Sequence, residues 1–125
     1  MGSLISAAVL RSLSGDRAFQ RLRKGQSGGS KHVTIRWRPN VHGEVRVGVV
    51  VSRKVGKAVV RNRVRRRLRE ALRETLKGGV TSAATSHSRP SFDLLVIARP
   101  SAADADYHEL KRSLRSAMAR AALTA

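Results

Sequence analysis

Arginines that recur along residues 52–76 are the side chains in this sequence best suited to chemistry. A guanidinium group is planar and always charged, so it can donate two parallel hydrogen bonds to a phosphate group or stack on a base. At 100° per residue, one face of a helix over this segment would carry an amide followed by four guanidinium groups: Asn62, Arg65, Arg66, Arg69 and Arg73. Like charges at i,i+4 weaken a helix, so this row favours the binding of a polyanion over a role in stability.

The alternative interpretation is that the row is ordinary solvated surface, as most short charge runs are. Glu70 and Glu74 lie on the flank of the same helix with Arg63 and Arg67, and Arg66 can pair with Glu70 at i,i+4. The central row has no neutralising carboxylates of this kind. We therefore favour a surface that binds a polyanion.

Side chains that could catalyse a reaction are few and scattered. The four histidines fall in four different predicted elements and show no metal-ligand spacing: His32, His42, His87 and His108. Acidic residues between Asp104 and Glu109 have a sufficient role in capping a helix. The stretch Val55-Gly56-Lys57-Ala58 is only superficially similar to a phosphate loop, because the expected first glycine and final Ser or Thr are missing. We expect no catalytic residue and no metal ligand in this chain.

The overall charge also points to an anionic partner. The chain has 125 residues, a net charge of +18 and a pI near 12.0, which favours nucleic acid first and an anionic membrane second. No apolar run approaches the roughly 20 residues that span a bilayer. Cysteine is absent, which excludes disulfides and cysteine zinc sites. The length predicts one RNA-binding domain over residues 1–125.

The start of the chain offers two weak targeting patterns, and we favour neither. Met1–Ser6 fits a myristoylation motif, and Leu4–Leu10 could be the core of a signal peptide. The second pattern lacks a basic segment before it and a cleavage site after it. We expect residues 1–12 to be a leader that can be disordered.

The elements that must position the arginines begin with a basic amphipathic helix. It is predicted over Ala7–Lys24, with an interruption near Ser14-Gly15, after which Asp16 can cap a second segment. Residues 25–30 then form a glycine-rich loop. This arrangement places one short helix before the first strand.

Two strands follow. Alternation predicts a half-buried strand over Lys31–Arg38, a turn over Pro39–Gly43 and a second strand over Glu44–Ser52. The inward residues would be Val33, Ile35 and Trp37 on the first strand and Val45, Val47, Val49 and Val51 on the second. Gly48 lies on the outer face, where it would allow close approach of a ligand backbone or mark a bulge.

The arginine helix is followed by a loop, a strand and a final helix. Gly78–Ser91 is predicted to be a flexible surface loop, and Phe92–Ala98 an interior strand covered on both faces. The last helix would begin at Ser101, Asp104 or Asp106. Its apolar residues recur at helical spacing, and its other face is basic: Tyr107, Leu110, Leu114, Met118 and Ala121 against Lys111, Arg112 and Arg115. These elements predict a layered α+β domain.

The run from Val51 to Glu70, with Arg61-Asn62-Arg63 followed by further basic residues, resembles the signature of the bacterial ribonuclease P protein subunit. Weaker similarity extends over Asp16–Gly25 and Asp93–Pro100. The resemblance implies a compact αβββαβα sandwich, with helices over a four-stranded mixed sheet and a left-handed βαβ crossover. It also implies one more strand than the patterns predict, which could lie in residues 25–32.

The same resemblance implies a function and its partners. The family's protein binds a catalytic RNA and guides the 5′ leader of precursor tRNA through a cleft between its first helix and the sheet. That RNA removes the leader with magnesium ions that it mainly holds itself. The implied partners are therefore the ribonuclease P RNA, bound by a monomer in a 1:1 complex, and the precursor tRNA leader. The resemblance implies no membrane partner and a cytoplasmic location.

The family's motif also assigns site residues. Positions that match its RNA-binding signature are Arg53, Lys54, Arg61, Asn62, Arg63, Arg65, Arg66 and Arg69. Positions assigned to the leader cleft are Phe19, Arg36 and Arg46. The chain departs from the family in having few aromatics for this cleft, with Leu22 or Arg23 where one is common. Guanidinium stacking and phosphate contact can substitute for base stacking there.

Three other functions remain open. A structural RNA-binding protein of ribosomal type would share the charge, size and fold but would need no leader cleft. A nucleoid-type DNA binder would call for a helix-turn-helix pattern, which is not evident. A protein-only nuclease would have to cleave RNA with the scattered carboxylates of this chain.

Overall fold

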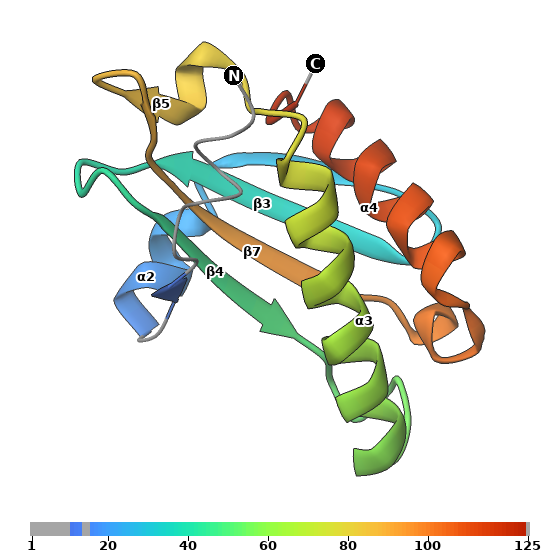
Figure 1. Ribbon diagram of the computed structural model, residues 1–125. Coiled ribbons are helices and arrows are strands. Elements are labelled where there is room, and N and C mark those ends of the chain that lie inside the picture. Colours follow the sequence, from blue (N-terminus) through green and yellow to red (C-terminus); the bar gives the residue numbers. More distant parts are fainter. Residues whose placement is uncertain (1–10, 14–15, 125) are drawn as a thin grey trace.

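The computed structural model describes residues 11–13 and 16–124, which form a mixed sheet with helices on both faces (Figure 1). The main elements are α2 (Asp16–Leu22), β2 (Gln26–Gly29), β3 (Val33–Pro39), β4 (Val45–Val50), α3 (Ala58–Leu76), β7 (Phe92–Ala98) and α4 (Tyr107–Arg120). This order reproduces the αβββαβα arrangement that the family resemblance implies.

Strand β7 lies at the centre of the sheet, whose order is β1-β4-β7-β3-β2. It is antiparallel to β3, from Val33 opposite Ala98 to Pro39 opposite Phe92. It is parallel to β4, and α3 connects these two parallel neighbours. Six of its seven residues are buried, so the prediction of an interior strand covered on both faces is confirmed.

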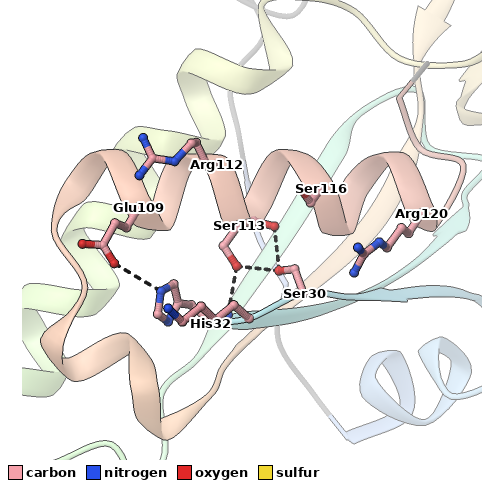
Figure 2. A pocket seen from close by; sticks show the side chains of 8 residues that line it. Ser30, His32, Glu109, Arg112, Ser113, Ser116 and Arg120 are labelled. Carbon is pink, nitrogen blue, oxygen red and sulfur yellow. Dashed lines mark hydrogen bonds and ion pairs between the residues drawn. The ribbon is translucent and has the colours of Figure 1, made fainter.

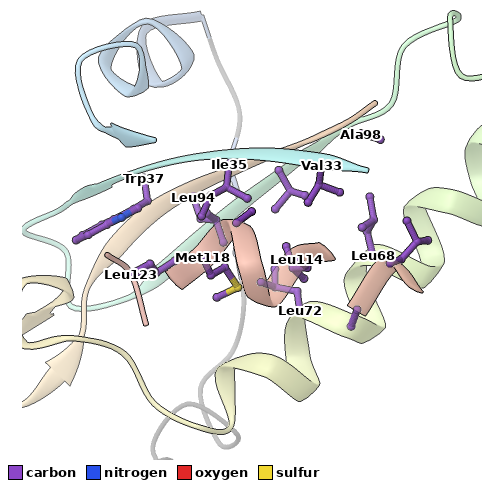
Figure 3. Packing of buried hydrophobic residues seen from close by; sticks show 14 of the residues in the cluster. Val33, Ile35, Trp37, Leu68, Leu72, Leu94, Ala98, Leu114, Met118 and Leu123 are labelled. Atoms are coloured by element: carbon purple, nitrogen blue, oxygen red, sulfur yellow. The ribbon is translucent and has the colours of Figure 1, made fainter. Parts of the chain in front are cut away.

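The main core lies between the sheet and the pair of helices α3 and α4 (Figure 3). Val33, Ile35 and Trp37 are buried on this face of β3, as their alternation predicts. The Trp37 indole N–H donates a hydrogen bond of 2.7 Å to the carbonyl of Ala121, just after α4. Burial of each large side chain here contributes about 1.5–3 kcal/mol.

Helix α3 buries the apolar stripe that its sequence predicts. Val64, Leu68, Ala71 and Leu72 are almost fully buried against the sheet and α4, while Val60 near the start is half-buried. The stripe is about 120° wide at helical spacing, so the opposite face of the helix is directed to solvent.

The N-terminal part differs from the predicted helix over Ala7–Lys24. Arg11–Ser12 form a short strand, β1, paired in parallel with Arg46 and Val47 of β4, and the Leu13 N–H continues the pairing at 2.9 Å to the Val47 carbonyl. The helix prediction was wrong at these residues because β4 otherwise has an open edge, whose backbone groups need partners. The part of the prediction before Arg11, including most of the expected leader over 1–12, lies outside the described residues.

Strand β2 occupies the place where the resemblance allowed an additional strand. Its sequence, Gln-Ser-Gly-Gly, has no apolar alternation. Gly28 is buried because α4 passes directly over it: a Cβ at this position would lie 2.3 Å from the Ala117 carbonyl oxygen. The strand is thus specified by its contact with α4 and not by its own pattern.

The segment over Gly78–Ser91 carries short ordered elements. These are the 3₁₀ turn η1 (Ser82–Ala84) and a hairpin of β5 (Thr85–Ser86) and β6 (Arg89–Pro90). Ala84 is buried, and its carbonyl accepts a hydrogen bond of 2.8 Å from the Ser91 N–H. The predicted flexibility of this segment stays a prediction.

Helix α4 begins at the last of its three predicted starts. The turn η2 (Pro100–Asp104) precedes it, and the Asp106 carboxylate accepts a hydrogen bond of 2.8 Å from the Glu109 N–H. This hydrogen bond is the main reason that the pKa of Asp106 is lowered. The acidic residues near 104–109 thus serve in part as the predicted helix cap.

Candidate nucleic-acid interface

The outer face of α3 carries the predicted row of polar side chains, which we call the arginine ridge: Asn62, Arg65, Arg66, Arg69 and Arg73. All are exposed except Arg65, which is half-buried and donates a hydrogen bond of 3.1 Å to the Asn62 side chain. Among the described residues, no ridge arginine forms an ion pair with a carboxylate, and Arg66 does not pair with Glu70. The ridge therefore presents uncompensated positive charge to solvent.

The start of α3 adds to this positive surface. Lys57 at the N-cap makes no side-chain hydrogen bond to the helix, and the first turn has no acidic residue. The first N–H groups of the helix are thus left for an external acceptor, and the helix dipole makes this end positive. Arg53 and Lys54, both exposed, lie in the turn just before it.

Gly56 shapes that turn. Its φ of 153° lies in a region that side chains rarely adopt, and a Cβ here would lie 3.2 Å from Val60. Val55 is buried beneath the turn, and its N–H donates a hydrogen bond to the Ser52 carbonyl. The basic pair of Arg53 and Lys54 is therefore held on a fixed turn beside the start of the helix.

Two arginines of α3 point away from the ridge. Arg63 donates a hydrogen bond of 3.3 Å to the carbonyl of Ala103, and Arg67 donates one of 3.0 Å to the carbonyl of Ala105. Both are half-buried, and the Nε atoms of Arg61 and Arg63 are buried without a hydrogen-bond partner among the described residues. Arg63 and Arg67 thus attach α3 to the segment before α4, a role that helical periodicity did not predict.

The three residues assigned to the leader cleft lie together on the other face of the sheet. Phe19 of α2 packs with Leu13, Leu22 and Leu95, and Arg36 of β3 is the strand partner of Leu95. Arg36 donates a hydrogen bond of 3.1 Å to the carbonyl of Arg23, which ties β3 to the segment just after α2.

Gly48 makes room for α2 on this face. A Cβ there would lie 3.2 Å from Leu95 Cδ1 and 3.3 Å from Phe19 Cε1. The pairing of β4 with β7 continues through Gly48 without an extra residue. The prediction of a bulge was therefore wrong, and the space beside Gly48 is taken up by the aromatic ring of α2.

Arg46 has a carboxylate partner. Its Nε and Nη2 donate hydrogen bonds of 2.7 and 2.8 Å to the two oxygens of Asp93, and Asn40 donates one of 2.8 Å to the same carboxylate. The hydrogen bond to Asp93 is the main reason that the pKa of Arg46 is raised. Arg46 is thus mostly occupied within the sheet, unlike the ridge arginines.

The remaining titratable side chains do not gather into a reactive site. His32 is buried, with its Nδ1 2.9 Å from the Ser101 hydroxyl and its Nε2 3.5 Å from Glu109. Within residues 11–13 and 16–124, no group of three or more His, Asp or Glu side chains is placed to hold a metal ion. Over the same residues, no helix is both long and apolar enough to cross a membrane.

A second cluster of cations was not singled out from the sequence. Lys31, Arg112 and Arg120 surround a pocket between α4 and the connection from β2 to β3. The one sequence feature that pointed to this cluster was the basic face of the last helix. That feature alone does not predict that Lys31 lies beside Arg112 and Arg120.

Comparisons with known proteins agree on one family. The Ribonuclease P family profile matches residues 9–122. The ribonuclease P protein component of Thermus thermophilus is 49% identical over 114 residues, which cover 91% of this chain and 61% of that protein. The chain therefore spans about three-fifths of the length of this relative. The corresponding protein of Kocuria rhizophila is 44% identical over 101 residues, covering 80% of each chain.

Solved structures give the same result for the fold. The RNase P protein of Staphylococcus aureus matches with a TM-score of 0.74 and 26% identity, over 94% of this chain and 100% of that one. The RNase P protein of Thermotoga maritima matches with a TM-score of 0.66 and 28% identity, over 83% and 91% of the two chains.

Proposed function

Since the chain belongs to the ribonuclease P protein family, we propose that it is the RNA-binding protein component of a ribonuclease P ribonucleoprotein. In this role it assists a catalytic RNA in the endonucleolytic removal of the 5′ leader from precursor tRNA. It binds one RNA subunit as a monomer and holds the leader of the substrate. Hydrolysis is carried out by the RNA, with magnesium ions that the RNA mainly holds.

The observation that carries this proposal is the arginine ridge. Its four guanidinium groups have no carboxylate partner among the described residues and stand on a rigid helix whose other face is buried in the core. Phosphate groups are the partners that such a row can bind with charge-assisted hydrogen bonds. Arg53, Lys54 and the uncapped start of α3 extend the same surface, and we assign them to RNA contact as well.

Arg63 of the family signature has a second role in this proposal. Arg63 is already bonded to the Ala103 carbonyl, so fewer of its N–H groups are left for RNA. We infer that it mainly fixes the orientation of α3, and that the exposed ridge and the turn before it supply most phosphate contacts.

The leader is assigned to the sheet face beside α2. Phe19, which is half-buried, is the aromatic side chain there, and Arg36 offers a guanidinium group that can stack on a base or contact a phosphate. Arg46 is held by Asp93, so it contributes mainly by keeping this face in shape.

Holding the leader and the catalytic RNA on one protein explains how this chain assists the reaction. Two RNA molecules repel each other, and arginines between them screen that repulsion. Substrate affinity then rises, and magnesium ions are more easily retained near the scissile phosphate by the RNA.

The proposal is tested by reconstitution with a bacterial ribonuclease P RNA at low magnesium concentration. Cleavage of precursor tRNA should require both components, and the complex should bind precursor tRNA more tightly than mature tRNA. A ribosomal-type RNA-binding protein would show equal affinity for the two tRNAs. Cleavage by the protein without added RNA would overturn the assignment of chemistry to the RNA.

A further inference from the structure

A pocket of about 370 Å³ lies between α4 and the connection from β2 to β3 (Figure 2), and none of its lining residues belongs to the arginine ridge. We call it the α4 pocket. Its rim is formed by Lys31, Arg112, Ser116 and Arg120. Neither the family signature nor the proposed leader site includes these residues.

The floor of the α4 pocket is a closed network of polar groups. Ser30 donates a hydrogen bond of 2.7 Å to the Ser113 carbonyl, and the two serine hydroxyls are bonded to each other. The His32 N–H donates a hydrogen bond of 2.9 Å to the Ser113 hydroxyl. This network fixes α4 to the strand connection, so the rim is presented on a rigid base.

The rim carries three cationic side chains against one carboxylate in the pocket lining, so its charge is net positive. Lys31 and Arg112 are exposed, and among the described residues the side chain of neither forms a hydrogen bond or an ion pair. Arg120 donates one hydrogen bond of 2.7 Å to the Gly29 carbonyl, which positions its guanidinium group and leaves other N–H groups available. The one carboxylate, Glu109, is turned to His32, with 3.5 Å between Oε2 and Nε2.

The spacing along α4 indicates what kind of anion fits. Arg112, Ser116 and Arg120 are separated by four residues each and follow one another along the helix in Figure 2. At a rise of 1.5 Å per residue, the two arginines lie about 12 Å apart along the axis, with Ser116 midway. A single phosphate ion cannot span such a row, whereas successive phosphates of one nucleic-acid strand can.

We propose that the α4 pocket is a second binding site for the ribose-phosphate backbone of RNA. Lys31, Arg112 and Arg120 contact phosphate oxygens, and the Ser116 hydroxyl donates to a phosphate between the arginines. This inference rests on the proposed RNA-binding function and adds a surface on α4 to the one on α3. The chain would then hold RNA at two separate places.

The test compares two pairs of substitutions on α4, made in a full chain that lacks three of the four ridge arginines. The background carries Arg65→Gln, Arg66→Gln and Arg69→Gln, and the pocket variant adds Arg112→Gln and Arg120→Gln. A matched control adds Lys111→Gln and Arg115→Gln, which remove the same charge from α4 outside the pocket. Affinity for a labelled single-stranded oligoribonucleotide is measured by fluorescence anisotropy over a range of salt concentrations, with thermal melts to check folding.

The background should retain RNA binding. In the pocket variant, the slope of log affinity against log salt should be smaller in magnitude than in the background by about 1.4. The control should leave that slope nearly unchanged. Equal slopes for the pocket variant and the control would overturn the proposal. Cleavage of precursor tRNA by the unmodified chain with a ribonuclease P RNA tests the proposed function separately. The proposed function and the proposed α4 site can therefore fail independently of each other.

Inorganic phosphate provides the second arm, because it offers the same oxyanion chemistry without a strand. Phosphate should displace the oligoribonucleotide only weakly, because one ion can occupy only one position of the row at a time. Phosphate binding that is lost in the pocket variant, while the affinity for the oligoribonucleotide stays equal to that of the background, would show a site for a single free anion and would overturn the assignment to an RNA strand.

Discussion

Replacing Arg66 with alanine should weaken the salt dependence of RNA binding, whereas replacing its neighbour Arg67 should not. Arg66 is exposed on the arginine ridge, while Arg67 donates a hydrogen bond of 3.0 Å to the Ala105 carbonyl and is half-buried. The two substitutions remove the same charge from adjacent positions. They therefore separate a direct phosphate contact from the overall charge of the helix.

The magnitude follows from the number of guanidinium groups on the ridge. Each phosphate neutralised contributes about −0.7 to the slope of log affinity against log salt for a single strand and about −0.9 for a duplex. The four ridge arginines then contribute roughly −3 to −4. Removing Arg66 should reduce the magnitude by about 0.7–0.9, so that the fall in affinity between about 50 and 200 mM salt becomes about threefold smaller.

Binding to a ribonuclease P RNA, measured by filter binding over this salt range, checks the prediction. Arg67→Ala should leave the slope unchanged and should lower the free energy of unfolding by about 1 kcal/mol through its lost hydrogen bond. If both variants shift the slope equally, or if Arg66→Ala shifts nothing, the ridge does not contact phosphates individually.

Three further predictions concern the fold around the two faces of the sheet. Gly28→Ala should lower the free energy of unfolding, measured by urea titration, by about 2–3 kcal/mol, because the new Cβ would lie 2.3 Å from the Ala117 carbonyl oxygen of α4. An unchanged free energy of unfolding would refute this close approach of α4 to Gly28. Asp106→Asn should remove a pH dependence of stability. The pKa of Asp106 is lowered in the fold by the hydrogen bond from the Glu109 N–H, so its contribution is present above the unfolded value near 4 and is lost as pH falls through the folded value. Melting temperatures of the two proteins should therefore converge as the pH falls below the unfolded value of about 4, and a constant difference would contradict this account. Gly48→Val should crowd Phe19 and speed hydrogen exchange in α2 by about tenfold or more while α3 is unaffected; unchanged exchange in α2 would show that the ring can move aside.

The elements that the sequence predicted well are those with a long local pattern. Helix α3 and strand β7 lie where periodicity and the apolar run placed them, because each has enough residues for its own pattern to decide. The exposed side of α3 follows from the buried side, so the ridge could also be predicted from the sequence.

The elements that it missed depend on distant parts of the chain. Strand β1 exists because the edge of β4 offers hydrogen bonds, and β2 exists because α4 covers Gly28. The inward direction of Arg63 and Arg67 depends on where η2 places two carbonyl groups. None of these partners can be located from the local pattern of the segment itself.

The central position of β7 has a bearing on how the chain folds during synthesis. Strands β3 and β4 are joined by a short turn, yet they do not pair with each other, because β7 lies between them. Neither has its inner neighbour until residues 92–98 have left the ribosome. The arginine-rich helix therefore emerges before the strand that completes its support, and folding must wait for these distant pairings, a topology that favours slow folding. A nascent chain stalled before residue 92 should lack the native sheet. Helix α3 would then have no sheet to pack on, and the arginine ridge would not be held in a fixed position.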